Sequence, residues 1–156
     1  MIRTLKSWLA GTFLWDLHQN GKLKVDFETL DLKVAYHTPC HVKALSPHTG
    51  LCNLLELIPG VSVQRIEKGC SGMAGTFGLA AEHFDQSTSI GGDLMSEMQT
   101  IDVNAGVTDC SSCRMQMEQE AVIPTVHPIK ILALAYGLMP ELAKALKSRP
   151  SGRVMS

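Results

Sequence analysis

Short apolar runs that resemble strands alternate along the chain with longer amphipathic runs that resemble helices. The predicted strands lie, in chain order, at residues 32–40, 61–70, 105–110 and 123–127. Helices are predicted between and after them, at residues 50–58, after Gly75, at 92–101, from Cys110 onward and from Pro128 onward. This alternation is typical of an α/β fold with a mostly parallel sheet. The right-handed crossover rule places helices on both faces, in a Rossmann-like layering.

Residues that end helices, together with changes in the apolar pattern, divide the chain into three parts. Spaced apolar residues predict a helix over residues 2–19, which ends at Asn20-Gly21. We therefore expect a leading helix and connector at residues 1–30, the cysteine-bearing domain at 31–147, and a disordered tail at 148–156.

Composition excludes several classes of protein. The 156 residues are 45% hydrophobic, enough to bury the core of one globular domain without disulfides. A formal charge of −1 offers no electrostatic footprint for nucleic acid, and no apolar run spans a bilayer. Five cysteines without a secretory signal favour a reducing, cytoplasmic compartment, where thiols serve metals or redox chemistry.

Three cysteines follow three different predicted strands. Cys40, Cys70 and Cys110 each lie at the carboxyl end of one of them. In a parallel α/β sheet these ends meet at one edge, where ligands collect. The pattern therefore predicts that thiols from remote parts of the chain meet at a single site.

Cys110 and Cys113 form a CxxC step at a predicted helix N-terminus, which favours thiolates. With Cys40 and Cys70 they make a set of four that suits an iron–sulfur cluster. Small residues such as Gly72 and Gly75 would let backbone N–H groups approach cluster sulfurs. A structural zinc ion on the same four thiols, or a CxxC dithiol acting alone, remains open.

Other candidate residues have a structural interpretation beside the functional one. Cys52 lies among leucines of a predicted helix and is expected in the core. His37 and His127 could be ligands or proton carriers, although polar contacts at strand ends are commoner roles. Met115 and Met117, after the CxxC, are expected to pack their helix.

Four motifs, "YHTPCH", "KGCSGMAGTFG", "TDCSSCRMQME" and "HPIKILALAYG", resemble the CCG or cysteine-rich domain. That domain occurs in the B subunit of heterodisulfide reductase, in the C subunit of anaerobic glycerol-3-phosphate dehydrogenase, and in iron–sulfur subunits of glycolate and lactate oxidation. The resemblance covers residues 32–139. It implies metal binding by Cys40, Cys70, Cys110 and Cys113.

The chain departs from the family pattern at Ser71, where the second cysteine of a Cys-Cys-Gly step would stand. Members with the full set can hold a noncubane [4Fe-4S] cluster through five thiolates. A serine hydroxyl is a poorer ligand for iron. The resemblance therefore implies an ordinary four-cysteine cluster, a modified one or none, with Ser71 as a ligand or hydrogen-bonding neighbour.

Relatives in this family usually carry two CCG domains, and residues 13–27 resemble the stretch that joins them. The chain thus resembles the carboxy-terminal half of a larger subunit. The implied function is an electron-transfer module of an oxidoreductase, relaying electrons from FAD on a partner or missing domain to an acceptor. Its implied location is cytoplasmic, either free or at the inner membrane face through a complex. A zinc-stabilised or cofactor-less interaction domain is the alternative.

Overall fold

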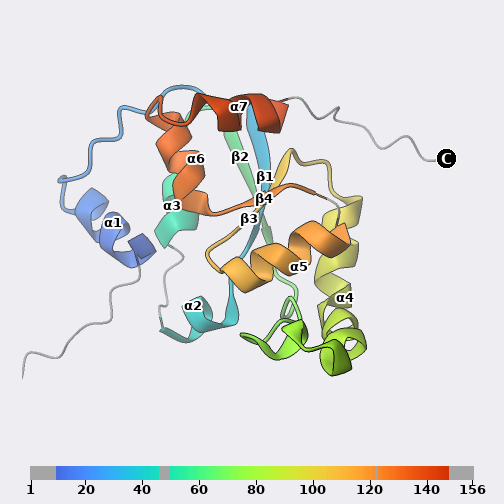
Figure 1. Ribbon diagram of the computed structural model, residues 1–156. Helices are drawn as coiled ribbons and strands as arrows, with labels where there is room; N and C mark the ends of the chain where they lie inside the picture. The colour runs from blue at the N-terminus through green and yellow to red at the C-terminus, as the bar shows by residue number, and fades with distance from the viewer. Residues whose placement is uncertain (1–9, 46–49, 122, 148–156) are drawn as a thin grey trace, which may run out of the picture.

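The computed structural model describes residues 10–45, 50–121 and 123–147 and places a four-stranded parallel sheet at the centre of the fold (Figure 1). The strands are β1 (Leu32–His37), β2 (Val61–Ile66), β3 (Ala105–Thr108) and β4 (Thr125–Val126). Their spatial order is β2-β1-β3-β4, and each neighbouring pair is parallel. The predicted α/β class and parallel sheet are confirmed.

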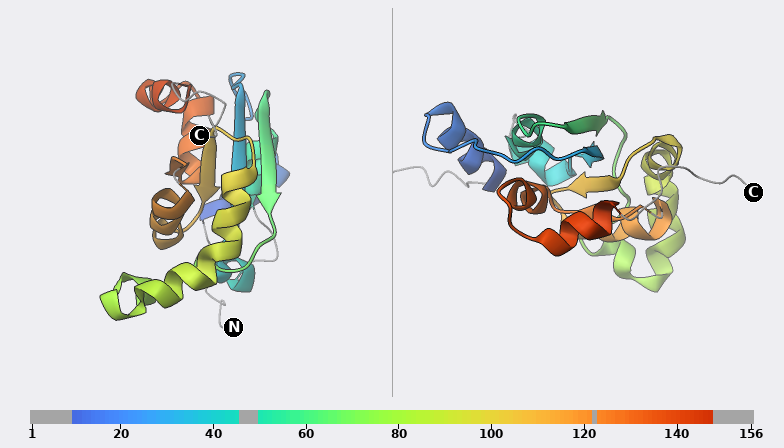
Figure 2. Two further views of the ribbon diagram at one scale, coloured as in Figure 1. Left: turned by 90° about the vertical axis from the view of Figure 1, so that its right-hand side faces the viewer. Right: turned by 90° about the horizontal axis from the view of Figure 1, so that it is seen from above.

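Helices cover both faces of this sheet, as Figures 1 and 2 show. One layer holds α1 (Ala10–Gln19), α3 (Gly50–Glu56), α6 (Pro128–Ala135) and α7 (Pro140–Lys147). The other layer holds α4 (Phe84–Thr100) and α5 (Ser111–Ala121). The short helix α2 (Cys40–Leu45) and the 3-10 turns η1 (Phe77–Leu79) and η2 (Ala81–His83) lie below the sheet in the view of Figure 1.

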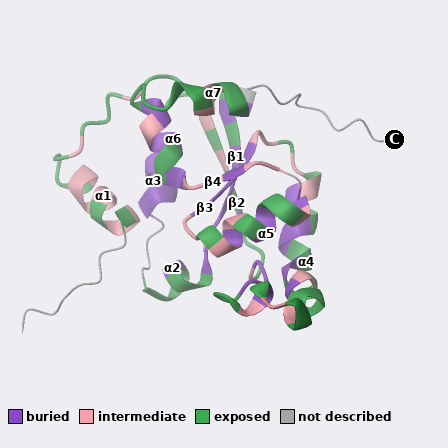
Figure 3. Cartoon of the chain, in the orientation of Figure 1, coloured by how far each residue is buried: buried purple, intermediate pink, exposed green. Residues whose placement is uncertain are grey.

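Alternate side chains of the strands pack into two hydrophobic cores, one on each face of the sheet. Val34 and Tyr36 of β1 face the layer of α3 and α6, whereas Ala35 faces α4 and α5. Successive residues of a strand point to opposite faces, so a strand covered on both sides is apolar nearly throughout. Figure 3 shows this burial along the strands and on the inner faces of the helices.

Helix α4 differs from the prediction of separate helical stretches after Gly75 and at 92–101. It runs unbroken from Phe84 to Thr100, through Gly91 and Gly92. Glycine lowers helix propensity, but a Cβ on Gly91 would lie 2.4 Å from the Ser71 carbonyl oxygen. Close packing of the 70–78 segment on α4 therefore requires this glycine. The short helix α2 was also not predicted, and α7 was not separated from the chain that follows α6.

The leading helix α1 packs on α3 through two glycines. A Cβ on Gly50 would lie 2.3 Å from the Gly11 carbonyl oxygen, so the two backbones approach closely. The helix ends at Gln19, before Gly21 with a φ of 67°, as predicted. The start of the predicted helix and the tail at 148–156 lie outside the described residues. None of the described helices has the length and apolar character needed to cross a bilayer.

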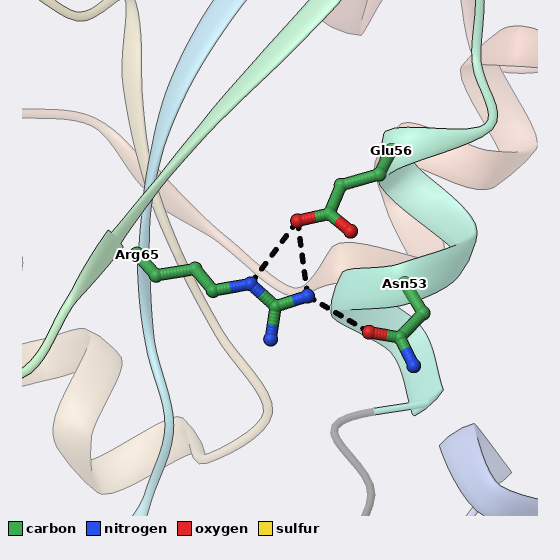
Figure 4. A network of polar contacts seen from close by, with 3 residues as sticks. All are labelled: Asn53, Glu56 and Arg65. Carbon is green, nitrogen blue, oxygen red and sulfur yellow. Dashed lines mark hydrogen bonds and ion pairs between the residues drawn. The ribbon is translucent and has the colours of Figure 1, made fainter.

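The edge strand β2 is tied to α3 by Arg65 (Figure 4). Its guanidinium donates to Glu56 Oε1 at 3.1 Å from Nε and 2.9 Å from Nη2, and to Asn53 Oδ1 at 2.8 Å. Because Arg65 and Glu56 are partly exposed, the ion pair stabilises the fold by about 1 kcal/mol at most.

Candidate functional site

The segments that follow β1, β2 and β3 carry four cysteines at the carboxyl edge of the sheet. Cys40 is the first residue of α2, and only Thr38 and Pro39 separate it from the end of β1. Cys70 lies in the loop that follows β2. Cys110 immediately precedes α5, and Cys113 lies in its first turn. The cysteines thus lie at the carboxyl ends of the strands, as predicted, and all are free thiols.

Electrostatic interactions link these thiols to one another. Burial raises the pKa of Cys40, and a hydrogen bond with Cys70 raises it further. Burial raises the pKa of Cys113 to about 12, and the charges of Cys110 and Cys70 act in the same direction. Cys70 therefore lies within electrostatic range of both Cys40 and Cys113, and we refer to Cys40, Cys70, Cys110 and Cys113 as the thiol group. Within the described residues, no three Cys, His, Asp or Glu side chains are placed as ligands of a single metal ion.

The two cysteines of the CxxC step differ in their acidity. Burial alone would raise the pKa of Cys110, but hydrogen bonds from the Cys113 backbone and the Ser112 side chain outweigh it and lower the pKa. The Cys110 sulfur lies 3.2 Å from Ser112 Oγ. Hydrogen-bond donors at a helix N-terminus stabilise a thiolate. Cys110 is accordingly the readier ligand or nucleophile, and Cys113 the protected one.

Ser71 lies inside the thiol group and is fully buried, with an exposed fraction of 0%. Its hydroxyl has no hydrogen-bond partner of good geometry among the described residues. It nevertheless lies close enough to Cys113 to lower the pKa of that thiol, against the larger effect of burial. A buried hydroxyl without a partner is costly, so this site fits an added acceptor or metal at the hydroxyl.

The glycines around Cys70 differ in why the structure needs a residue without a side chain. The Gly72 N–H donates to Cys70 Sγ at 3.3 Å, as expected for a backbone group that approaches sulfur. A Cβ on Gly72, however, would lie 1.9 Å from the Ser87 carbonyl oxygen of α4, and its φ is 94°. Packing on α4 therefore requires this glycine. A Cβ on Gly75, with a φ of 72°, or on Gly69 would meet no atom within 4 Å.

Two residues that the sequence did not single out fix the turn before the CxxC step. The hydroxyl of Tyr36, 1% exposed, donates to Asp109 Oδ2. Burial raises the pKa of Asp109, whereas this hydrogen bond and the nearby His127 and His41 oppose the rise. The contact joins β1 to the residue before Cys110. The sequence offered two signals for this contact: a tyrosine within a predicted strand, and an aspartate directly before a cysteine.

Several residues that the sequence offered as possible ligands or proton carriers pack the core or cap a helix instead. Cys52 is fully buried in the core, as predicted. His127 caps α6, where its Nδ1 accepts from the Ile129 N–H at 3.2 Å. Met117 is fully buried, but Met115 is 46% exposed, so the prediction that it packs the helix is wrong. Met115 lies on the outer side of α5.

His37 is the remaining candidate, and its environment is unusual. It is fully buried, and neither ring nitrogen has a hydrogen-bond partner among the described residues. Burial, with a smaller effect of Lys43, lowers the pKa of His37 to about 4. The ring is therefore neutral at pH 7, with one N–H donor and one acceptor nitrogen.

This burial predicts an acid-sensitive contribution of His37 to stability. Its pKa is lower in the folded state than in the unfolded chain, so the unfolded state binds more protons as the pH falls below about 6.5. The wild type should lose about 2 kcal/mol of unfolding free energy from this group between pH 7.5 and pH 5. His37→Gln should lack that part of the loss. Urea unfolding of both proteins at the two pH values measures it, and equal losses would contradict this assignment.

A parallel α/β sheet with four cysteines at its carboxyl edge defines a cysteine-rich domain. The family model of the CCG cysteine-rich domain matches residues 34–118, and the chain belongs to this family. It is similar to the C subunit of anaerobic glycerol-3-phosphate dehydrogenase of Escherichia coli strain K12, with 35% identity over 127 residues. The same values hold for the O157:H7 protein.

These alignments cover 81% of this chain but 32% of each relative. The chain thus spans about a third of the length of the curated relatives that it matches.

Proposed function

We propose that this chain is an iron–sulfur electron-transfer module of an oxidoreductase, with Cys40, Cys70, Cys110 and Cys113 as ligands of one [4Fe-4S] cluster. The observation that carries the proposal is the thiol group itself, in which Cys70 interacts with thiols from two other segments. Thiolates from separate segments are the ligands that iron–sulfur clusters require.

The bound cluster would supply reversible one-electron transfer, and the chain supplies ligation, orientation and hydrogen bonds. The Gly72 N–H at Cys70 and the hydrogen bonds at Cys110 offset negative charge on sulfur. Such bonds favour the reduced state and raise the reduction potential. The hydrogen bond from the Tyr36 hydroxyl to Asp109 would hold the turn that precedes Cys110.

The partners in this proposal follow from the family. Its relatives are named as subunits of a dehydrogenase. A flavin dehydrogenase subunit, or an upstream domain with a second CCG repeat, would deliver electrons from FAD. The parent reaction would oxidise glycerol 3-phosphate, glycolate or lactate, or reduce a heterodisulfide. The proposed location is the cytoplasm, either free or at the inner face of the membrane through that complex.

Reversible reduction of anaerobically purified protein tests the electron-transfer role. Dithionite should bleach the broad visible absorption of the cluster, and a mild oxidant should restore it over several cycles with unchanged iron content. Protein that holds iron and sulfide but neither bleaches nor recovers would contradict a role in electron transfer. The same titration gives the number of electrons accepted per chain.

Replacing Ser71 with cysteine is expected to change the type of cluster. Ser71 lies beside Cys113 and is fully buried, so a sulfur at this position would join the thiol group. It would restore the five-thiolate pattern of family members with noncubane clusters. We expect altered electron paramagnetic resonance and absorption spectra at equal iron content. Ser71→Ala adds no ligand and should keep the wild-type type of cluster, and identical spectra in S71C and wild type would contradict the prediction.

A second candidate function, thiol–disulfide exchange by Cys110 and Cys113, is favoured by their unequal acidity. The pKa of Cys110 is lowered and that of Cys113 is raised to about 12, the asymmetry of a nucleophilic and a protected thiol. In that case Cys40→Ala and Cys70→Ala should leave the exchange activity of iron-free protein intact. Iron loss in both variants without any exchange activity in the wild type would exclude this function.

A further inference from the structure

Buried polar groups without partners gather beneath the thiol group. Among the described residues, five side chains with exposed fractions of 0–3% carry an unpaired nitrogen or oxygen: His37, Ser71, Ser87, Thr108 and Gln116. Ser87 lies on α4 against Gly72 and Gly78. Ser71 is already next to Cys113. Each unpaired buried polar group costs about 1–3 kcal/mol, so several together indicate a missing shared partner.

The sheet register places His37 and Thr108 side by side. They are paired residues of β1 and β3, and each is the last residue of its strand. His37 lies two positions after Ala35, which packs against α4 and α5, so its side chain faces the same layer. Thr108 lies two positions after Gly106, whose Cβ would meet Met98 and Met117 of that layer. Both side chains therefore point to one face.

The same layer contains the CxxC sulfurs. Cys113 is part of the core between the sheet and α4 and α5, and Cys110 packs against it. Gln116 lies one turn after Cys113 on α5, and its amide nitrogen has no partner among the described residues. His37 thus lies at the strand end that leads into Cys40, on the face where Cys113 is buried. It has one N–H to donate.

We propose that His37 donates its ring N–H to a sulfur atom of the iron–sulfur centre and thereby raises the reduction potential of that centre. The inference rests on the proposed function. Thr108 is a positioning residue: its hydroxyl, unpaired in the structure, belongs to the residue paired with His37, and with the centre bound it would donate to the other ring nitrogen and fix which nitrogen carries the proton. An N–H aimed at sulfur stabilises the reduced centre, because that state carries more negative charge.

The test measures the midpoint potential of the full chain, loaded with iron under anaerobic conditions. His37→Phe removes the donor within a similar shape, His37→Gln keeps an N–H, and Thr108→Val removes only the hydroxyl. His18→Gln on α1, a helix of the other layer, is the control. We expect H37F to lower the ratio of reduced to oxidised centre at fixed potential about tenfold, or by about 59 mV for one electron. H37Q and T108V should shift less, in the same direction, and H18Q should not shift.

A measurement on the wild type makes the test independent of how the variants fold. Pulsed electron paramagnetic resonance of protein with 15N-labelled histidine should detect coupling between a ring nitrogen and the paramagnetic centre. Absence of that coupling, or an iron-loaded H37F with the wild-type potential, would overturn the role of His37 and leave the electron-transfer function standing. A wild type without iron and sulfide would instead overturn the proposed function.

Discussion

Cys70→Ala is expected to abolish cluster binding. Cys70 interacts with both Cys40 and Cys113, so its loss removes a ligand and the thiol that joins the two parts of the site. Three remaining thiolates would leave one iron without a protein ligand in a four-cysteine site. Iron and sulfide per chain in anaerobically purified protein should fall from the wild-type content to near zero.

Cys52→Ala is the matched control for this prediction. Cys52 is equally a free thiol, but it is buried in the core on the face of α3 and α6. Its truncation should cost about 1 kcal/mol of stability and leave the iron content unchanged. The assignment of ligands would be wrong if C70A kept its iron, or if folded C52A lost it.

Gly72→Ala is expected to cause the largest loss of stability among the glycines of the 69–75 segment. The added Cβ would lie 1.9 Å from the Ser87 carbonyl oxygen, at a φ of 94°. Overlap with backbone and the left-handed conformation together should cost on the order of 3–5 kcal/mol. Urea unfolding measures the loss, and the displaced Cys70 should also lower iron content.

Two neighbouring glycines separate the overlap from the backbone conformation. Gly75 has a φ of 72° but open space around a Cβ, so Gly75→Ala should cost about 1 kcal/mol. Gly69 has open space and no positive φ, so Gly69→Ala should change stability by less than about 0.5 kcal/mol. If G72A were as stable as G69A, the close packing of this segment on α4 would be refuted.

The sequence predicted the sheet because each strand carries β-branched or other apolar residues and is bounded by turn residues. It did not predict α2, since a helix of six residues carries little periodic signal, and it did not separate α7 from the chain that follows α6. It divided α4 at Gly91-Gly92, because glycine disfavours helix in isolation. The Ser71 carbonyl oxygen, 2.4 Å from a Cβ at Gly91, requires that glycine, and tertiary packing is not visible in a local pattern.

At the site, too, the sequence predicts the positions that depend on local pattern but not the contacts that depend on tertiary packing. Cys40, Cys70 and Cys110 could be assigned to one edge because each follows a strand of a parallel sheet. The contact between Tyr36 and Asp109, and the pairing of His37 with Thr108, depend on the register of β1 against β3. No sequence pattern fixes that register. Likewise, position 72 requires glycine because the segment packs closely on α4, and not because of its neighbour Cys70.

Elemental analysis of the anaerobically prepared chain tests the shared inorganic centre most directly. Iron, acid-labile sulfide and zinc are measured per chain on the same sample, beside C70A and C52A. The proposal predicts about four iron and four sulfide per chain for a [4Fe-4S] cluster, little zinc, and loss of both iron and sulfide in C70A only. A colourless protein with one zinc per chain, or with no metal at all, would contradict it.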